Sequence, residues 1–250
     1  MSKNHTTTPL ATAPTNPWLY INWKYTVASC DTAVITPAYC SRKGIDIQNL
    51  PEPFSGNIKS NVVCLNLNPG WGELDKCFYG DPSFLKFTQN TLKHKGTDYL
   101  WDTPFMCKNG KIHGGYNWWQ ERTKALRCQL CPKPLNFFVL EFFPYHTKKA
   151  FSFPSHLPSN EYRNWLLCQA MKDNKLIVVL RGRDRWFRIK DKCCDGQPLG
   201  DKLCDYEKAG RVIIHQNPQS VYLTEKNFKP NDWEKLIAAL KLNITNKQHQ

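Results

Sequence analysis

The chain has 250 residues, 41% of them hydrophobic and 13% aromatic, so it can bury one sizeable core but hardly two. Lysine and arginine outnumber aspartate and glutamate by 34 to 21, and the net charge of +13 favours a polyanionic partner, with nucleic acid the first candidate. No run approaches the roughly 18 consecutive apolar residues of a membrane helix, so no membrane-spanning segment is expected.

The first segment, Met1–Asn16, is rich in Thr, Asn and Pro and predicts a disordered tail ahead of one domain over 17–245. Because this segment contains no apolar run of the kind found in signal peptides, we expect a cytoplasmic protein. The eleven cysteines are then expected to be mostly reduced thiols rather than a disulfide framework.

Four short apolar, β-branched runs predict buried strands of a parallel sheet, because helices on both faces make such strands apolar throughout. The runs cover 61–67, 136–140, 175–180 and 211–215. Helices are expected from near Asn117, after the N-cap Ser159, and from Asn231, whereas the Gly- and Pro-punctuated segment 191–210 predicts a surface loop. The alternation predicts an α/β fold, a single-domain three-layer α/β/α structure around a mostly parallel four-stranded sheet.

Polar clusters follow each of the four runs. They are 68–70 (Asn-Pro-Gly), 141–146 (Glu-Phe-Phe-Pro-Tyr-His), 181–185 (Arg-Gly-Arg-Asp-Arg) and 217–220 (Asn-Pro-Gln-Ser). In open parallel sheets ligands bind where the strands finish, because loops and helix N-termini converge there. One Asn-Pro turn is common in loops, but two of them after different buried strands can face one another across a pocket.

These two turns carry a resemblance to the uracil-DNA glycosylase superfamily, closest to its mismatch-specific and single-strand-selective branches. The stretch 65–70 (Leu-Asn-Leu-Asn-Pro-Gly) looks like their first motif and 217–220 resembles their second, with agreement in order and strand placement over residues 60–225. The resemblance implies a monomeric, monofunctional DNA glycosylase of base-excision repair. Such an enzyme flips a damaged or deaminated base, uracil or a related one, out of DNA and hydrolyses its N-glycosidic bond without a metal or other cofactor.

By this resemblance, Asn68 orients the water that attacks C1′, and Asn217 donates its amide N–H to the departing base. An amide cannot remove a proton at neutral pH, so catalysis would be mainly electrostatic. The resemblance implies a base pocket lined by Leu67, Pro69, Gly70, Glu141, and Phe78 or Tyr79, one of which stacks on the base. His146 has no secure counterpart in the best-known branches and is expected at the same pocket from its place after the second run. The resemblance also implies a DNA contact at Ser220, with Tyr222 or Leu223 either filling the gap left by the flipped base or folding back on the core. Arg181, Arg183 and Arg185, which follow the third run, are expected to contact phosphates, with a solvated basic loop as the alternative.

Glu141 departs from the family, because uracil-reading members have an Asn at this strand end. An ionised carboxylate only accepts hydrogen bonds and suits a base with donors at that edge, whereas a protonated one can still donate to uracil. If Glu141 pairs with Arg181 or Arg183 instead, the protein binds DNA without cutting it. His146 either supplies a positive charge to the leaving base or hydrogen-bonds a backbone carbonyl. His215, two residues before Asn217, either touches the ligand or lies in the core.

Three functions stay open: a glycosylase, which we favour, a DNA-binding protein that has lost catalysis, and a nucleotide or small-molecule hydrolase in which the two Asn-Pro turns are coincidental. The cysteines offer a metal alternative. Zinc or an iron–sulfur cluster would draw on Cys128, Cys131, Cys193, Cys194 and Cys204. Cluster-bearing branches place their ligands ahead of the first motif, however, so scattered thiols are favoured.

Overall fold

The computed structural model describes residues 13–22, 26–78, 80–96, 102–107, 110–131, 135–148, 153–154, 156–193 and 195–245. Its α-helices within these residues are α1 (Pro37–Lys43), α2 (Pro82–Leu92), α3 (Gly114–Leu130), α4 (Asn160–Lys172), α5 (Arg183–Trp186), α6 (Leu199–Lys208) and α7 (Pro230–Thr245). Its strands are β1 (Ile21–Asn22), β2 (Val27–Ala28), β3 (Ile45–Asp46), β4 (Phe54–Gly56), β5 (Val62–Asn66), β6 (Phe138–Glu141), β7 (His146–Thr147), β8 (Leu176–Val179) and β9 (Val212–Ile214).

The central sheet is mixed and has five strands among the described residues, in the order β4-β6-β5-β8-β9, where four were expected. β5, β6, β8 and β9 lie within or overlap the four apolar runs and pair in parallel. The fifth strand, β4, pairs antiparallel with β6. At its end Gly56 has a φ of +87°, and a Cβ there would lie 2.2 Å from the Phe137 carbonyl oxygen, so this turn requires glycine.

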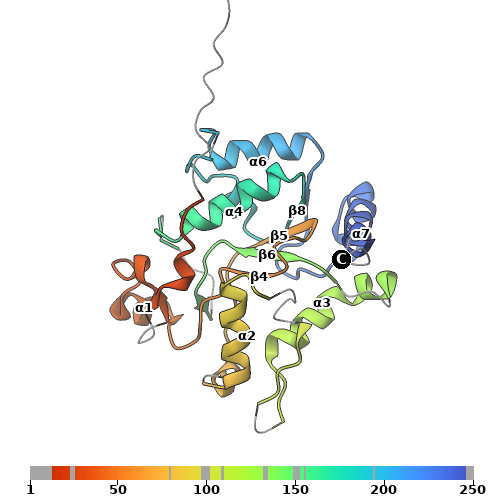
Figure 1. Ribbon diagram of the computed structural model, residues 1–250. Coiled ribbons are helices and arrows are strands. Elements are labelled where there is room, and N and C mark those ends of the chain that lie inside the picture. Colours follow the sequence, from red (N-terminus) through yellow and green to blue (C-terminus); the bar gives the residue numbers. More distant parts are fainter. Residues whose placement is uncertain are drawn as a thin grey trace, which may run out of the picture.

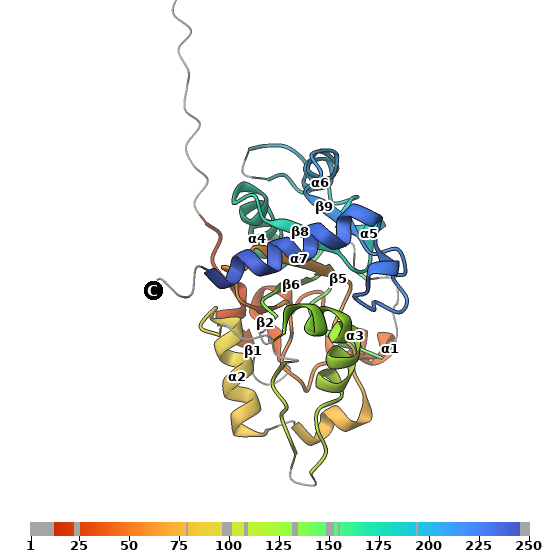
Figure 2. The same cartoon turned by 90° about the vertical axis from the view of Figure 1, so that its right-hand side faces the viewer.

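Helices cover both faces of the sheet (Figures 1 and 2). On one face α4 and α6 pack against side chains such as Leu65, and on the other α3 and α7 pack against side chains such as Cys64. Neighbouring residues of one strand thus enter two separate cores, as the period of two of a strand requires. The two short antiparallel pairs, β1-β2 and β3-β7, lie outside the central sheet.

The expectation of a surface loop over 191–210 is wrong for half of that segment, because α6 occupies Leu199–Lys208. Leu199 and Leu203 are fully buried, and Tyr206 continues the same stripe at helical spacing. Three apolar side chains are enough to bury one face of this helix. Among many polar residues and the surrounding Gly and Pro, they gave no clear helical pattern in the sequence. The expected helix near Asn117 begins earlier, at Gly114, because the His113 side chain accepts a hydrogen bond from the Gly115 N–H and caps it.

Cys168 of α4 forms a disulfide with Cys193, a pairing that the expectation of mostly reduced thiols did not anticipate. Eight other cysteines are free thiols, and Cys194 lies outside the described residues. Across the described ranges, no three His, Cys, Asp or Glu side chains come together as a metal-binding group. Of the predicted tail only 13–16 is described, and none of the helices in the described chain has the length and apolar character needed to cross a bilayer.

Candidate functional site

Four polar clusters meet at one edge of the central sheet. The strands β5, β6, β8 and β9 run parallel, so the residues that follow them lie at the same edge, which we call the carboxyl edge. It carries Asn68 after β5, Glu141 at the end of β6, Arg181 after β8 and Asn217 after β9.

Asn66 and Glu141 form a side-chain pair at this edge because they are direct partners in the β5–β6 register. The Asn66 Nδ2 donates to Glu141 Oε1 over 2.9 Å. The two remaining polar atoms, Asn66 Oδ1 and Glu141 Oε2, are buried and have no hydrogen-bond partner in the described part of the chain. Burial raises the pKa of Glu141 to about 8, against the opposing effects of Asn66 and Arg181, so the carboxyl is mostly neutral at pH 7.

The amide of Asn68 is held in one orientation by Thr147 of the neighbouring strand β7 and by Pro69. Its Nδ2 donates to the Thr147 hydroxyl oxygen over 2.8 Å and to the Pro69 carbonyl over 3.0 Å. The Thr147 N–H in turn donates to the Pro69 carbonyl over 3.2 Å. With both amide protons directed inward, Oδ1 is the atom of Asn68 left to accept a hydrogen bond from a ligand or water.

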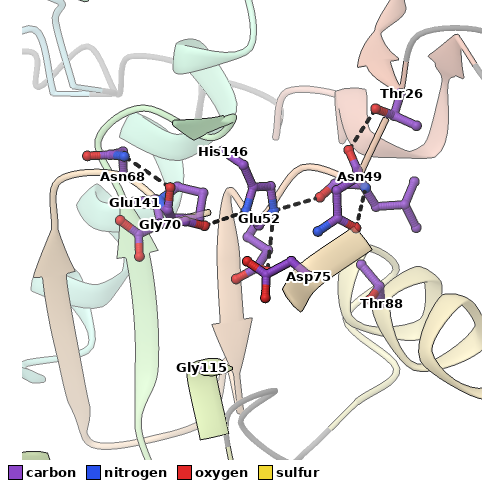
Figure 3. A network of polar contacts seen from close by, with 12 residues as sticks. Thr26, Asn49, Glu52, Asn68, Gly70, Asp75, Thr88, Gly115, Glu141 and His146 are labelled. Atoms are coloured by element: carbon purple, nitrogen blue, oxygen red, sulfur yellow. Dashed lines mark hydrogen bonds and ion pairs between the residues drawn. The ribbon is translucent and has the colours of Figure 1, made fainter. Parts of the chain in front are cut away.

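His146 fastens the Asn-Pro-Gly loop to the segment before β4 (Figure 3). Its Nδ1 lies 2.8 Å from the Gly70 carbonyl oxygen, and its Nε2 lies 3.0 Å from the Leu50 carbonyl oxygen and 3.4 Å from Glu52 Oε1. His146 is 1% exposed and acts as a buried brace of the loop, and of the two roles considered for it the structure has the bond to a backbone carbonyl.

Three buried groups near His146 gave no signal in the sequence. Burial, followed by the neighbouring Glu141 and Asp75, raises the pKa of Glu52 well above its ordinary value. Burial also raises the pKa of Asp75, and lowers that of His113 to about 3. Since His113 Nδ1 accepts from the Gly115 N–H, its Nε2–H faces Asp75 Oδ1 at 3.2 Å. The groups come from three separate segments, which only the fold brings together.

His215 holds the loop that carries Asn217 by hydrogen bonds to its backbone. His215 is 2% exposed, its Nδ1 accepts from the Asn217 N–H over 3.1 Å, and its Nε2 lies 2.9 Å from the Tyr222 carbonyl, so it is a core histidine that braces this loop. The Asn217 Oδ1 accepts from the Ser220 N–H over 3.3 Å. The exposed Asn217 amide therefore has its Nδ2 donors left for a ligand.

Arg181 is bonded to the Asn217 loop and lies in the electrostatic neighbourhood of Glu141. Its guanidinium donates to the Pro218 carbonyl over 3.1 Å and to the Gln219 carbonyl over 3.3 Å. Burial lowers the pKa of Arg181, and the nearby Glu141 acts in the opposite direction, which puts both groups in one electrostatic neighbourhood. Within the described chain neither Arg181 nor Arg183 forms an ion pair with Glu141, and Arg183 pairs instead with Glu207 at 3.2 Å.

The structure separates the two residues considered for insertion into DNA. Leu223 is 0% exposed and its N–H donates to the Arg122 carbonyl, so the expectation that Leu223 enters a duplex is wrong for this conformation. Tyr222 is 38% exposed, with the Arg122 guanidinium 4.2 Å from its ring centre. Phe78 is 1% exposed and packs on Phe84 and His113, so it has no free face for a base, and Tyr79 lies outside the described residues.

Aromatic–cation pairs next to both Asn-Pro loops were also missed. Trp71 follows Gly70, and the Lys148 ammonium lies 4.1 Å from its ring centre. Beside the second loop, Arg122 lies between Tyr222 and Trp118 and donates to the Ser220 carbonyl over 2.8 Å. Aromatic rings that alternate with cations are the usual surface for stacking bases and neutralising phosphates.

We compared the chain with known protein families, curated proteins and solved structures. Models of known families, curated proteins and solved structures all gave no match to the chain. The resemblance of the two Asn-Pro motifs to uracil-DNA glycosylases therefore depends on the residues of the carboxyl edge themselves.

Proposed function

We propose that the protein is a monofunctional DNA glycosylase, acting as a cytoplasmic monomer, that hydrolyses the N-glycosidic bond of a flipped deaminated base. The observation that carries the proposal is the Asn66–Glu141 pair, a neutral carboxyl and an amide whose remaining polar atoms are buried and unpaired at the carboxyl edge that also carries the two Asn-Pro loops. Buried polar atoms without partners cost stability, and a function explains why they are tolerated.

The pair supplies one donor and one acceptor. Because Glu141 Oε1 accepts from Asn66, the proton of the neutral carboxyl belongs on Oε2, where it can donate, and Asn66 Oδ1 can accept. These two atoms match the adjacent carbonyl and ring N–H that uracil, hypoxanthine and xanthine share. The neutral state of Glu141 thus removes the objection that an ionised carboxylate would repel the uracil carbonyl.

The two loop amides take complementary parts in the proposed chemistry. Asn68 presents Oδ1 and orients a water toward C1′, while Asn217 presents Nδ2 and donates to the base as it leaves with negative charge. Neither amide gains or loses a proton, because the proton that the attacking water loses passes to the departing base anion through solvent, and the rate enhancement comes from preorganised dipoles around an oxocarbenium-like transition state. The aromatic–cation pairs at Trp71 and Tyr222 supply contacts for the strand.

The test is abasic-site formation on oligonucleotides that each carry uracil, hypoxanthine, xanthine or a mismatch. Wild-type protein should cleave at least one lactam-bearing base, and Asn68→Ala should lose about a hundredfold to a thousandfold of that rate, the range for one preorganised polar group. The exposed Asn231→Ala on α7 is the matched control and should cleave normally. Wild-type protein that leaves the whole panel intact would refute the proposal.

A second candidate is a DNA-binding protein on the same scaffold that does not cleave. The burial of Asn66 Oδ1 and Glu141 Oε2 favours this function. A base can reach the two atoms only after the residues at the carboxyl edge move apart. Binding to all oligonucleotides with a steep salt dependence, and with no abasic product, selects this function over the first.

A further inference from the structure

A second feature, a cavity of about 610 Å³, lies outside the candidate site between α4, α5 and the segment that follows α5. Its charged lining consists of Arg163, Arg185, Arg188, Lys190, Asp184 and Asp191. Four basic and two acidic side chains leave a formal excess of two positive charges. Such a lining favours an anion, and the volume is within the range of small-molecule sites.

Arg163 is an unusual part of this lining because it is 5% exposed and yet has no hydrogen-bonded carboxylate in the described structure. Its guanidinium donates to the Phe142 carbonyl and to the side-chain oxygens of Asn160 and Asn164, all of which are neutral. These contacts use four of its five N–H groups and leave one on Nη2. The carboxylate nearest in effect, Asp191, accepts from the Asn164 amide over 2.8 Å.

A buried cation without a direct counter-ion is costly, because its desolvation is not repaid by an adjacent negative charge. Burial accordingly lowers the pKa of Arg163 to about 9, even though Asp191 acts in the opposite direction. An anion in the cavity would supply the missing negative charge. The exposed Arg188 and Lys190 would then close over it from the segment after α5.

The position of the cavity relates it to the carboxyl edge. Phe142, which lines it, directly follows Glu141 at the end of β6, and the Phe142 ring lies 4.7 Å from the Arg163 guanidinium. The Cys168–Cys193 disulfide ties the segment that carries Arg188 and Lys190 to α4. The cavity is therefore a built recess held on both sides.

We propose that this cavity is a phosphate-binding site, which takes the phosphate group of a free nucleotide or of a nucleic-acid strand. A phosphate monoester carries about −1.5 to −2 charges at pH 7, which matches the excess of two positive charges, whereas a strand phosphodiester, like a carboxylate, carries one and neutralises half of it. Arginine forks bind phosphate oxygens in a bidentate geometry. The proposal does not require that the protein cleaves DNA.

The experiment is isothermal titration of the full chain with inorganic phosphate, with a deoxynucleoside 5′-monophosphate and with a short unphosphorylated single strand. Arg163→Met removes the buried cation. Arg188→Gln removes an exposed cation of the same cavity, and because its side chain is exposed this variant should fold normally. Arg211→Gln is the control, since it removes the same charge from an exposed side chain beside the start of β9, outside the cavity lining.

Each cavity variant should bind at least about tenfold more weakly, the expected loss of a charge-assisted hydrogen bond, while the control stays within about twofold. If the monophosphate binds with this pattern, the source is a free nucleotide or a phosphorylated end. If only the single strand does, the source is a strand phosphate. The proposal is overturned if no ligand binds, or if the control loses as much affinity as the cavity variants.

Discussion

Replacing Glu141 by glutamine tests the claim that a neutral carboxyl lies at the carboxyl edge. The glutamine amide has nearly the same shape, keeps an oxygen that can accept from Asn66 Nδ2, and puts N–H donors where the Oε2 proton is now. It cannot ionise. The substitution therefore removes the titration of this group and preserves its hydrogen-bonding pattern.

The size of the effect follows from the pKa. Burial raises the Glu141 pKa from 4.5 to about 8, so between these values the folded chain holds one proton more than the unfolded chain. The free energy of unfolding therefore falls as pH rises through this window and levels off above it. The loss from this group alone is roughly 3 kcal/mol by pH 7 and roughly 5 kcal/mol in full, as an order of magnitude.

Urea unfolding at several pH values, on wild type and Glu141→Gln in parallel, measures this effect. Glu52 contributes a slope of the same sign to both proteins, so the difference between the two curves reports Glu141 together with its electrostatic coupling to Glu52. The variant should gain stability relative to wild type between pH 5 and pH 8, whereas the exposed Glu234→Gln should follow wild type throughout. Parallel curves for wild type and Glu141→Gln would show that Glu141 is ionised in the fold and would refute the reasoning.

Substitutions at four further positions probe the loops. Thr147→Val should release the Asn68 amide and slow base release about tenfold, whereas Thr147→Ser, which keeps the hydroxyl, should retain the wild-type rate. The loss should appear in kcat and not in KM, because the groups that bind DNA stay intact. Leu223→Ala should lower the free energy of unfolding by about 2–5 kcal/mol in urea titrations, whereas exposed Tyr222→Ala should leave stability nearly unchanged and weaken DNA binding. Arg122→Gln should loosen the Asn217 loop and speed its amide exchange, and unchanged exchange would exclude the brace at Ser220.

The strands of the central sheet could be located from sequence to the extent that they are buried on both faces. Continuous Val, Ile and Leu runs mark β5 and β8, because nothing else in a short segment explains such apolar residues. β4 has three residues and no such run, and its place is fixed by pairing with β6. α6 was missed for the related reason that three apolar side chains suffice to bury it.

The candidate site was predictable where motifs follow strand ends and unpredictable where tertiary contacts decide. The positions of Asn68 and Asn217 follow from the chain order of two buried strands. The neutral state of Glu141 depends on complete burial, and the roles of His146 and Thr147 depend on β7 lying against the first loop. None of these contacts leaves a local pattern, because each joins residues distant in the chain.

Mass spectrometric detection of a free base is the most direct test of the central claim. Wild-type protein incubated with uracil-containing single- and double-stranded DNA, and with the hypoxanthine equivalents, should release the free base and leave an intact abasic strand in equal amount. The release should decline above pH 8 in wild type as Glu141 ionises and persist in Glu141→Gln. Release of no base from any substrate, or release that is unaffected by Asn68→Ala, would contradict the account.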